Sequence, residues 1–475
     1  MPSLNRILTR RQLLRAFGVG AAGAFLAACA PAPAPTAAPQ VVKETVEVVK
    51  EQTVVVKETA AAPAQATYSG ELSVMVLKGP PVEPVCNFLA VALTSKYPGV
   101  KIKTEYLVGD LGEVAYTRAA AGTLDDVYFS ADNWVVPFAK NGVSLDLKPF
   151  AEADKAVDLN DIFPAMLGLG SFNGQVHMLP SALDVVTMYY NKTLFEKAGA
   201  DLPADTWTWD DFIAQAKKIT ALEKDTNGKP KYWGLSNATW NWWATVYPWI
   251  VGYGGKVKSD DGGTSTWSDP KTLEALTAYT ELWTKHNIAQ PLGLDVGGDA
   301  FQLGRAAVWT HIPGARQGVR DAVGDKFEWD VQLMPKMPDG KHRTGMGCWG
   351  LSVYSKSKMK EVAYEYLKYM ITPAGQRLMA SKDMGVPLLQ SVAKDPSWME
   401  GLQPPPKNLK AYVNGAQDAV LPVVDYPPDC GSFYAGVVCQ AYQSALEAAI
   451  RGTKKLDQAF KECDATIQNC LQEHK

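Results

Sequence analysis

Acidic and aromatic side chains occur together at several points of this sequence, and together they suit reversible binding of a polar ring. Asp132-Asn133-Trp134 directly follows the run Asp126–Phe129, whose β-branched and aromatic residues predict a strand. Side chains at the carboxyl end of such a strand lie where α/β sheets bind ligands. An indole face covers the apolar side of a ring, while carboxylates and amides pair with hydroxyl groups. These three residues are candidates for ligand contact; the alternative is an Asx turn beside a packed tryptophan.

A second dense group is Trp240-Asn241-Trp242-Trp243. Three tryptophans within four residues cannot all enter one core, so at least one is expected to face a ligand. The sequence does not decide which one. The chain has fourteen tryptophans and nineteen tyrosines, more than a core requires, which also favours an aromatic-lined surface cleft.

Catalytic and metal-binding patterns are missing from the sequence. The five histidines are scattered, and neither His-Glu-x-x-His nor Gly-x-Ser-x-Gly occurs. Adjacent acids such as Asp125-Asp126, Asp210-Asp211 and Asp260-Asp261 resemble turns or helix starts. The net charge of −3 gives no basic footprint for nucleic acid. We therefore expect no enzyme activity, no cofactor, no metal and no nucleic-acid partner.

The N-terminus predicts export. Residues 1–28 combine a charged region containing Arg10-Arg11 with a short apolar stretch, which predicts a signal peptide of twin-arginine type. Leu26-Ala-Ala-Cys29 is typical of a lipoprotein processing site, so Cys29 is the expected lipidated residue. We expect an extracytoplasmic protein held by its lipid on the outer face of the cell membrane.

Residues 29–69 predict a flexible tether. Prolines between 31 and 39 favour extended backbone, and residues 41–61 repeat every seven residues with apolar positions at heptad spacing. Three heptads rich in valine make a marginal helix. A weakly associating helical spacer and a disordered stalk both fit, and we expect a monomer.

The remainder of the chain predicts two α/β domains, because strands alternate with helices and the length exceeds one core. The predicted strands and helices are 71–77, 85–96, 100–106, 116–121, 126–129, 185–190, 194–198, 206–220, 268–279, 304–310, 327–335, 358–370, 433–451 and 456–472. Six cysteines follow Cys29 and permit many pairings. Cys439 and Cys463 lie at similar distances from the Gly452 turn, so a bridge between them is predicted, with unbridged buried cysteines as the alternative.

The order of these segments, and Pro180–Gly199 above all, resembles the bacterial extracellular solute-binding proteins of sugar ABC importers. The pattern departs at Thr187, where a small residue is usual. The resemblance implies two α/β lobes of the periplasmic-binding-protein type, joined by hinge strands and each discontinuous in sequence. Lobe 1 is expected to contain 70–183 and 332–385, and lobe 2 is expected to contain 184–331 and 386–475. Residues 327–335 are the expected second crossing.

The resemblance also implies where a ligand is held between the lobes. It adds to the candidates a hinge carboxylate, the tryptophan cluster, a strand residue, a tryptophan in a glycine-rich loop and a late aromatic pair: Asp184, Trp240, Trp242, Trp243, Trp309, Trp349, Phe433 and Tyr434. Where related proteins carry a further stacking tryptophan, this chain has Gly314. Core packing, or for Asp184 a bond that fixes the hinge, is the alternative for these positions.

The resemblance implies capture of a sugar or oligosaccharide by hinge closure and its delivery to the permease subunits of an ABC importer. Glycerol phosphate, a polyamine or another small solute in the same fold is the alternative, and an anchored secreted hydrolase is a more distant one. Mostly aromatic and acidic candidates favour a neutral sugar over a phosphate. Acids and aromatics also suit a polyamine.

Overall fold

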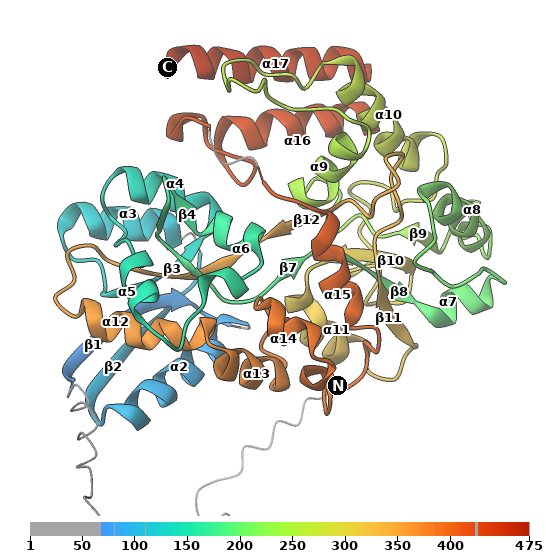
Figure 1. Cartoon of the computed structure of the whole chain (residues 1–475). Coiled ribbons are helices and arrows are strands. Elements are labelled where there is room, and N and C mark those ends of the chain that lie inside the picture. The colour runs from blue at the N-terminus through green and yellow to red at the C-terminus, as the bar shows by residue number, and fades with distance from the viewer. Residues whose placement is uncertain (1–67, 80, 110, 423–425, 475) are drawn as a thin grey trace, which may run out of the picture. The chain divides into compact units, whose positions relative to one another are not determined.

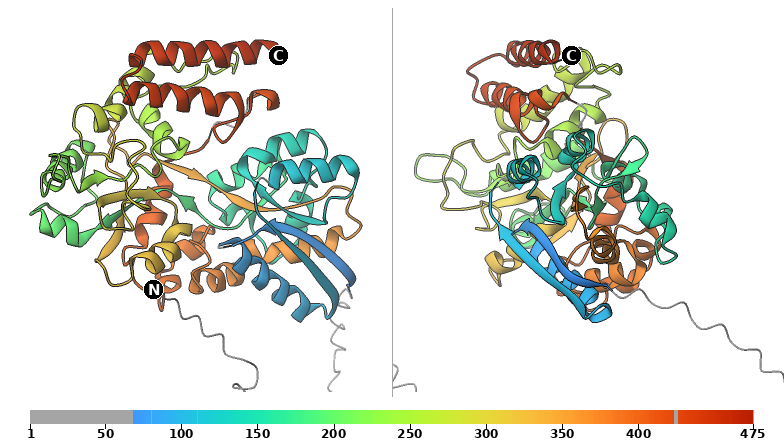
Figure 2. Two further views of the ribbon diagram at one scale, coloured as in Figure 1. Left: turned by 180° about the vertical axis from the view of Figure 1, so that it is seen from behind. Right: turned by 90° about the vertical axis from the view of Figure 1, so that its left-hand side faces the viewer.

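The computed structural model describes residues 68–79, 81–109, 111–422 and 426–474, which form one compact unit (Figure 1). Two larger sheets with their helices lie on either side of a small central sheet (Figures 1 and 2). This is the predicted two-lobed α/β fold. The predicted signal peptide, the Cys29 anchor and the heptad-like tether lie outside the described residues and stay predictions. In the described part, no helix is long and apolar enough to cross a membrane.

Lobe 1 is built on a five-stranded sheet in the order β2-β1-β3-β13-β6. Its strands are β1 (Ser69–Leu77), β2 (Gly99–Leu107), β3 (Val127–Ala131), β6 (Leu179–Pro180) and β13 (Trp349–Val353). β1 is parallel to β2 and β3, whereas β13 is antiparallel to both β3 and β6. The helices and the small hairpin of this lobe are α2 (Val82–Lys96), α3 (Leu111–Ala121), α4 (Asp132–Lys140), α5 (Lys148–Ala153), α6 (Pro164–Leu169), β4 (Ser171–Phe172), β5 (Gln175–Val176), α12 (Lys360–Leu367), α13 (Pro373–Ser381) and α14 (Gln390–Lys394).

The core of lobe 1 follows from its apolar patterns. β1 buries Leu72, Val74 and Val76 completely, as expected for a strand covered by helices. α2 buries Val85 and Leu89 at helical spacing. The predicted strands and helices of the first 131 residues that fall in the described part are thereby confirmed.

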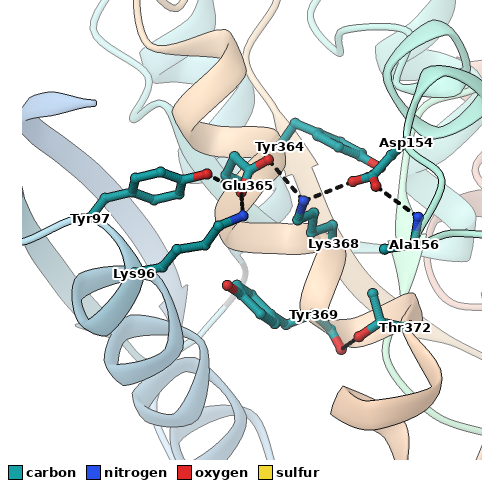
Figure 3. Close-up of polar contacts among 9 residues, drawn as sticks. All are labelled: Lys96, Tyr97, Asp154, Ala156, Tyr364, Glu365, Lys368, Tyr369 and Thr372. Carbon is teal, nitrogen blue, oxygen red and sulfur yellow. Dashed lines mark hydrogen bonds and ion pairs between the residues drawn. The ribbon is translucent and has the colours of Figure 1, made fainter. Parts of the chain in front are cut away.

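A polar network on lobe 1 joins segments that are far apart in sequence (Figure 3). Glu365 of α12 accepts hydrogen bonds from Lys96 Nζ at 3.1 Å and from the Tyr97 hydroxyl at 3.0 Å. Lys368, which directly follows α12, donates to Asp154 Oδ2 at 2.8 Å and to Glu365 Oε1 at 2.9 Å. These bonds fix the late helix α12 to the end of the early helix α2.

Lobe 2 is built on a four-stranded sheet in the order β11-β8-β10-β9. Its strands are β8 (Thr187–Asn191), β9 (Trp233–Leu235), β10 (Ala306–His311) and β11 (Trp329–Gln332). Its helices are α7 (Lys192–Lys197), α8 (Trp209–Thr220), α9 (Trp243–Gly252), α10 (Pro270–Thr284), α11 (Arg316–Val323), α16 (Gly436–Ile450) and α17 (Leu456–Glu473). The predicted cap of α8 is confirmed, because Thr208 and Asp211 form a reciprocal capping box.

The hinge is a three-stranded sheet in the order β14-β12-β7. It contains β7 (Asp184–Val185), β12 (Thr344–Gly347) and β14 (Ala419–Val420), and α15 (Lys410–Gly415) precedes β14. The predicted strand 185–190 is thus divided between β7 and β8. The remaining short 3-10 helices are η1 (Leu159–Asp161), η2 (Pro313–Ala315), η3 (Lys368–Ile371), η4 (Pro396–Met399), η5 (Ala416–Asp418) and η6 (Pro428–Cys430).

The second crossing lies later than the sequence predicts. β11, within the expected crossing 327–335, is paired with β8 inside the lobe 2 sheet. The chain instead passes into lobe 1 between β12 and β13, because β12 pairs with the hinge strand β7 and β13 pairs with β3. The expected return to lobe 2 at residue 386 also differs from the structure, because Leu389 is bridged to Ile162 and Val392 of α14 lies in the core that contains the lobe 1 strands. The other limits assigned to the two lobes stay a prediction.

The predicted Cys439–Cys463 bridge is wrong. The disulfide joins Cys430, which ends η6, to Cys470 of α17, with their Cα atoms 5.7 Å apart. Cys439 and Cys463 are free and buried in the core of lobe 2. Distance from a helix turn predicts the axial level of a cysteine but not its direction, and a bridge requires both Cβ vectors to face each other.

Candidate functional site

Three polar side chains from three parts of the chain converge where β12 passes into β13. Asp132, at the start of α4, accepts hydrogen bonds at Oδ2 from the Cys348 N–H at 2.9 Å and from the Tyr434 hydroxyl at 3.0 Å. Asp184 lies opposite Gly347, because β7 and β12 pair in that register. Lobe 1, the hinge and lobe 2 therefore meet around one peptide unit, Gly347–Cys348.

A glycine at position 347 is what allows this approach. A Cβ atom there would lie 2.8 Å from Asp132 Oδ2 and 3.1 Å from Tyr434 Oη, too close for either oxygen to stay in place. Asp132 is held from a second direction, since its N–H donates to the Cys348 carbonyl at 3.2 Å. The sequence favours this local arrangement, because an acid in the first turn of α4 is stabilised by the helix dipole.

Both carboxyl groups have raised pKa values. Burial raises the pKa of Asp132 to about 6, although the N–H of Cys348, the hydroxyl of Tyr434 and the N–H of Asn133 lower it. Burial, and after it the neighbouring charge of Asp132, raises the pKa of Asp184 to about 7. Oδ1 of Asp132 is buried and has no hydrogen-bond partner within the described part of the chain. Both carboxyl groups therefore titrate close to neutral pH.

Two cavities flank this junction. The first, of about 180 Å³, brings Asp184 of the hinge and Trp349 of lobe 1 together with residues of both lobes. Its other lining residues are Pro81, Pro84, Ala182, Pro313, Gly314, Arg316, Gln317, Lys382, Asp383, Met384 and Gly385. The second, of about 380 Å³, lies between α4 and residues 426–436 and includes Asn133. Asp184, Trp349 and Asn133 are therefore the candidates that line open space.

The aromatic candidates of lobe 2 form one continuous group. Trp243 is fully buried, with its ring centre 6.1 Å from that of Phe433 and 5.7 Å from that of Tyr434. Trp242 is half-buried and lies 5.8 Å from the His311 ring. Trp243 and Phe433 serve the core of the lobe, while Trp242 and Tyr434 keep part of their surface exposed.

The other candidates lie further from the acid pair or pack into the lobes. Trp134 packs on Phe138 in lobe 1, and Trp240 lies at the edge of the lobe 2 core. Trp309 is buried on β10 beside His311, their ring centres 4.4 Å apart. Burial lowers the pKa of His311 to about 4, so this ring is neutral near pH 7.

An ion pair that lines the first cavity was not predicted from the sequence. Arg316 Nη2 lies 2.5 Å from Asp383 Oδ1, and Arg320 Nη1 lies 2.6 Å from Asp383 Oδ2. Arg316 is 2% exposed, and its guanidinium also lies over the Tyr412 ring. Arg316 follows the predicted strand 304–310 by six residues, and no local pattern there identifies Asp383 as its partner.

Comparison with known proteins identifies the family. Residues 87–377 match the family model described as bacterial extracellular solute-binding protein. The chain belongs to this family. Members are binding proteins that act outside the cytoplasm, so the protein is an extracytoplasmic solute-binding protein. Among the described residues, no three His, Cys, Asp or Glu side chains gather closely enough to hold a metal ion.

Relatives and solved structures agree with this assignment. A Brucella abortus (strain 2308) protein described as a binding protein is 25% identical over 394 residues, covering 80% of this chain and 88% of its own length. The ABC substrate-binding protein Lmo0181 of Listeria monocytogenes, solved in complex with cycloalternan, superposes with a TM-score of 0.71 at 23% identity, covering 85% of this chain and 99% of that one. The cyclic α-maltosyl-1,6-maltose binding protein of Arthrobacter globiformis superposes with a TM-score of 0.69 at 21% identity, covering 86% and 100%.

Proposed function

We propose that this protein captures a sugar or oligosaccharide between its lobes and delivers it to the permease of an ABC importer. The observation that carries the proposal is the meeting of lobe 1, hinge and lobe 2 at Asp132, Asp184 and Tyr434. A ligand that touches all three holds the lobes closed, and closure is the form that a permease can recognise. Similar folds bind cycloalternan and a cyclic maltosyl-maltose, which supports a carbohydrate ligand.

The chemistry of the junction suits hydroxyl-rich rings. Carboxyl oxygens of Asp132 and Asp184 accept from hydroxyl groups, and the exposed parts of Trp242 and Trp349 provide apolar faces. A micromolar Kd requires about −8 kcal/mol, which a few buried hydrogen bonds and one or two stacked rings can supply after ordering costs. Asn133 and Tyr434 are the further residues proposed to contact ligand; Trp134, Trp240, Trp243, Trp309 and Phe433 are proposed to support them.

The cellular setting is part of the same proposal. A signal peptide of twin-arginine type and a lipid on Cys29 would place a monomeric protein on the outer face of the membrane, with residues 29–69 as its tether. Replacing Cys29 by Ser is expected to move the protein from the membrane fraction to the soluble fraction. Continued membrane fractionation of Cys29→Ser would contradict the lipid anchor.

The proposal is tested by a thermal-shift screen of the purified protein against neutral sugars, oligosaccharides, glycerol phosphate and polyamines. A ligand that binds only the folded state raises Tm by mass action. Calorimetry with the best sugar should then show at least about a tenfold loss of affinity for Asp184→Asn. Glu196→Gln, at an exposed acid of α7, is the matched control and should bind normally. Shifts with non-sugars alone would overturn the carbohydrate proposal and keep the fold.

A further inference from the structure

The acid pair at the lobe junction has no counter-charge. Among the described residues, no lysine, arginine or histidine forms an ion pair with Asp132, which is 2% exposed, or with Asp184, which is half-buried. The charge that acts on Asp184 is that of Asp132, which is of the same sign. Buried charges are ordinarily paired, so two acids side by side without a cation are an unusual arrangement.

The two acids share one environment. After burial, the charges of Asp132 and then Asp184 raise the pKa of the Cys348 thiol that lies between them. Asp132 receives neutral donors, the Cys348 N–H and the Tyr434 hydroxyl, and its Oδ1 stays without a partner. Each donor hydrogen bond stabilises an anion, but none neutralises it. The missing element is a positive charge at this Oδ1 and at Asp184.

The charged groups on the surrounding walls do not provide it. In the first cavity, Arg316 lies 2.5 Å from Asp383, and its buried Nε and Nη1 have no hydrogen-bond partner within the described part of the chain. Arg316 is not among the charges that act on Asp184, and Lys382 is exposed. In the second cavity, Lys140 is exposed, and Asp429 lies 3.1 Å from His474. The remaining titratable groups in contact with the pair, Tyr434 and Cys348, are uncharged at neutral pH because burial raises both of their pKa values.

Aromatic rings stand beside the acids. Trp349 lines the same cavity as Asp184, and Tyr434 lies directly against Asp132 with part of its ring exposed. Ring faces attract a cation through their quadrupole, most strongly where water is excluded. Carboxylates and rings together form the recognition chemistry of an ammonium group that is carried on a larger scaffold.

We propose that the cleft selects a sugar-like solute that carries a protonated amine, with Asp132 and Asp184 as its counter-charges. This inference rests on the proposed sugar-capture function and names the substrate class within it. An ammonium group placed between the carboxyls removes their mutual repulsion and meets the unpartnered Oδ1. A neutral sugar leaves the pair holding its proton.

Binding of an amine and binding of a neutral sugar should differ in the number of protons exchanged with the buffer. With pKa values of about 6 and about 7, the pair binds about one proton at about pH 6.5 in the free protein. An incoming ammonium favours both ionised carboxylates, so binding releases protons to the buffer. A neutral sugar releases none, and takes up protons if the protonated acid donates to one of its oxygens.

The experiment compares two probes that differ at one position per ring: the glucosamine trimer and the glucose trimer of the same linkage. Isothermal calorimetry at about pH 6.5, in buffers of different ionisation enthalpy, gives the affinity and the protons exchanged. We expect the glucosamine trimer to bind at least about tenfold more tightly and to release protons. Asp184→Asn should abolish both differences, and Glu196→Gln should preserve them.

Each outcome separates this inference from the function on which it rests. A neutral sugar that binds as tightly as its amine counterpart without proton release overturns the amine inference and leaves sugar capture intact. If no neutral sugar and no amino sugar binds, both the amine inference and the sugar-capture proposal are overturned. Binding of spermidine alone would overturn both as well. If Asp184→Asn fails to fold, proton release by the unaltered protein and by Asp132→Asn still decides the question.

Discussion

Lobe 2 presents to the cleft aromatic rings that its own core holds in place, whereas lobe 1 and the hinge present carboxyl groups with few partners. Trp243 and Phe433 are fully buried among other rings, and the Cys430–Cys470 disulfide fixes the loop that carries Tyr434. Asp132 is held by hydrogen bonds from the Cys348 N–H and the Tyr434 hydroxyl beside Gly347, and Asp184 lies opposite that glycine. One side of the site is therefore held rigid by the packing of aromatic rings. The other side carries two carboxyl groups that have no cationic partner, and its properties depend on their charge.

The largest expected effect concerns the packed side. Trp243→Ala should lower the free energy of unfolding by about 3–5 kcal/mol, because it leaves a cavity among stacked rings. Trp242→Ala, at the half-buried neighbour, should lower it by less than about 1.5 kcal/mol. Urea denaturation measures both. Equal destabilisation by the two variants would contradict the division between core ring and cleft ring.

The disulfide is the next largest contribution to the rigid side. Cys430→Ser with Cys470→Ser should lower the free energy of unfolding by roughly 2–4 kcal/mol, since the bridge closes a loop in the unfolded chain. Dithiothreitol should lower Tm of the unaltered protein toward that of the double variant and leave the double variant unchanged. A double variant that still responds to reductant would show that another bridge exists.

The contribution of the two carboxyl groups to the free energy of unfolding should depend on pH. The folded protein keeps protons on Asp132 and Asp184 up to about pH 6 and 7, whereas the unfolded chain loses them near pH 4. Between these values the folded state binds more protons, so the contribution of the pair to stability falls as pH rises. His311, with its lowered pKa, contributes with the opposite sign.

The difference between the unaltered protein and Asp184→Asn isolates the acid pair from His311. Denaturation of the ligand-free proteins across this pH range should show the variant gaining stability relative to the unaltered protein as pH rises. A difference that stays constant with pH would mean that Asp184 is already ionised in the folded state.

The smallest expected effect is at the bond between the two sides. Tyr434→Phe removes the hydroxyl group that donates a hydrogen bond to Asp132, and it should lower the free energy of unfolding by about 1–2 kcal/mol. Small-angle scattering of the ligand-free protein should show a more open average form. Tyr232→Phe, at a lobe 2 hydroxyl that contacts Lys197, is the control and should leave the scattering unchanged.

Local features of this fold were predictable from sequence, and long-range ones were not. The Thr208 cap follows from nearby residues, as does the apolar run 185–190, although the structure divides that run between β7 and β8. The Arg316–Asp383 pair and the Cys430–Cys470 bridge depend on how distant segments dock, which no periodicity encodes. The sequence identified Asp132 and Asp184 as separate candidates. Their meeting at the Gly347–Cys348 peptide depends on the path of the chain from β12 into β13, which the sequence did not predict.

The place of β13 in the lobe 1 sheet has a consequence for biosynthesis. β13 is the strand between β3 and β6, yet it is made from residues 349–353, long after either neighbour. A nascent chain that ends before this point carries β3 with an open edge, and open edges invite pairing with other chains. Lobe 1 leaves the ribosome first, but its sheet is completed late. Until β13 is made, the open edge of β3 must be prevented from pairing with other copies of the chain.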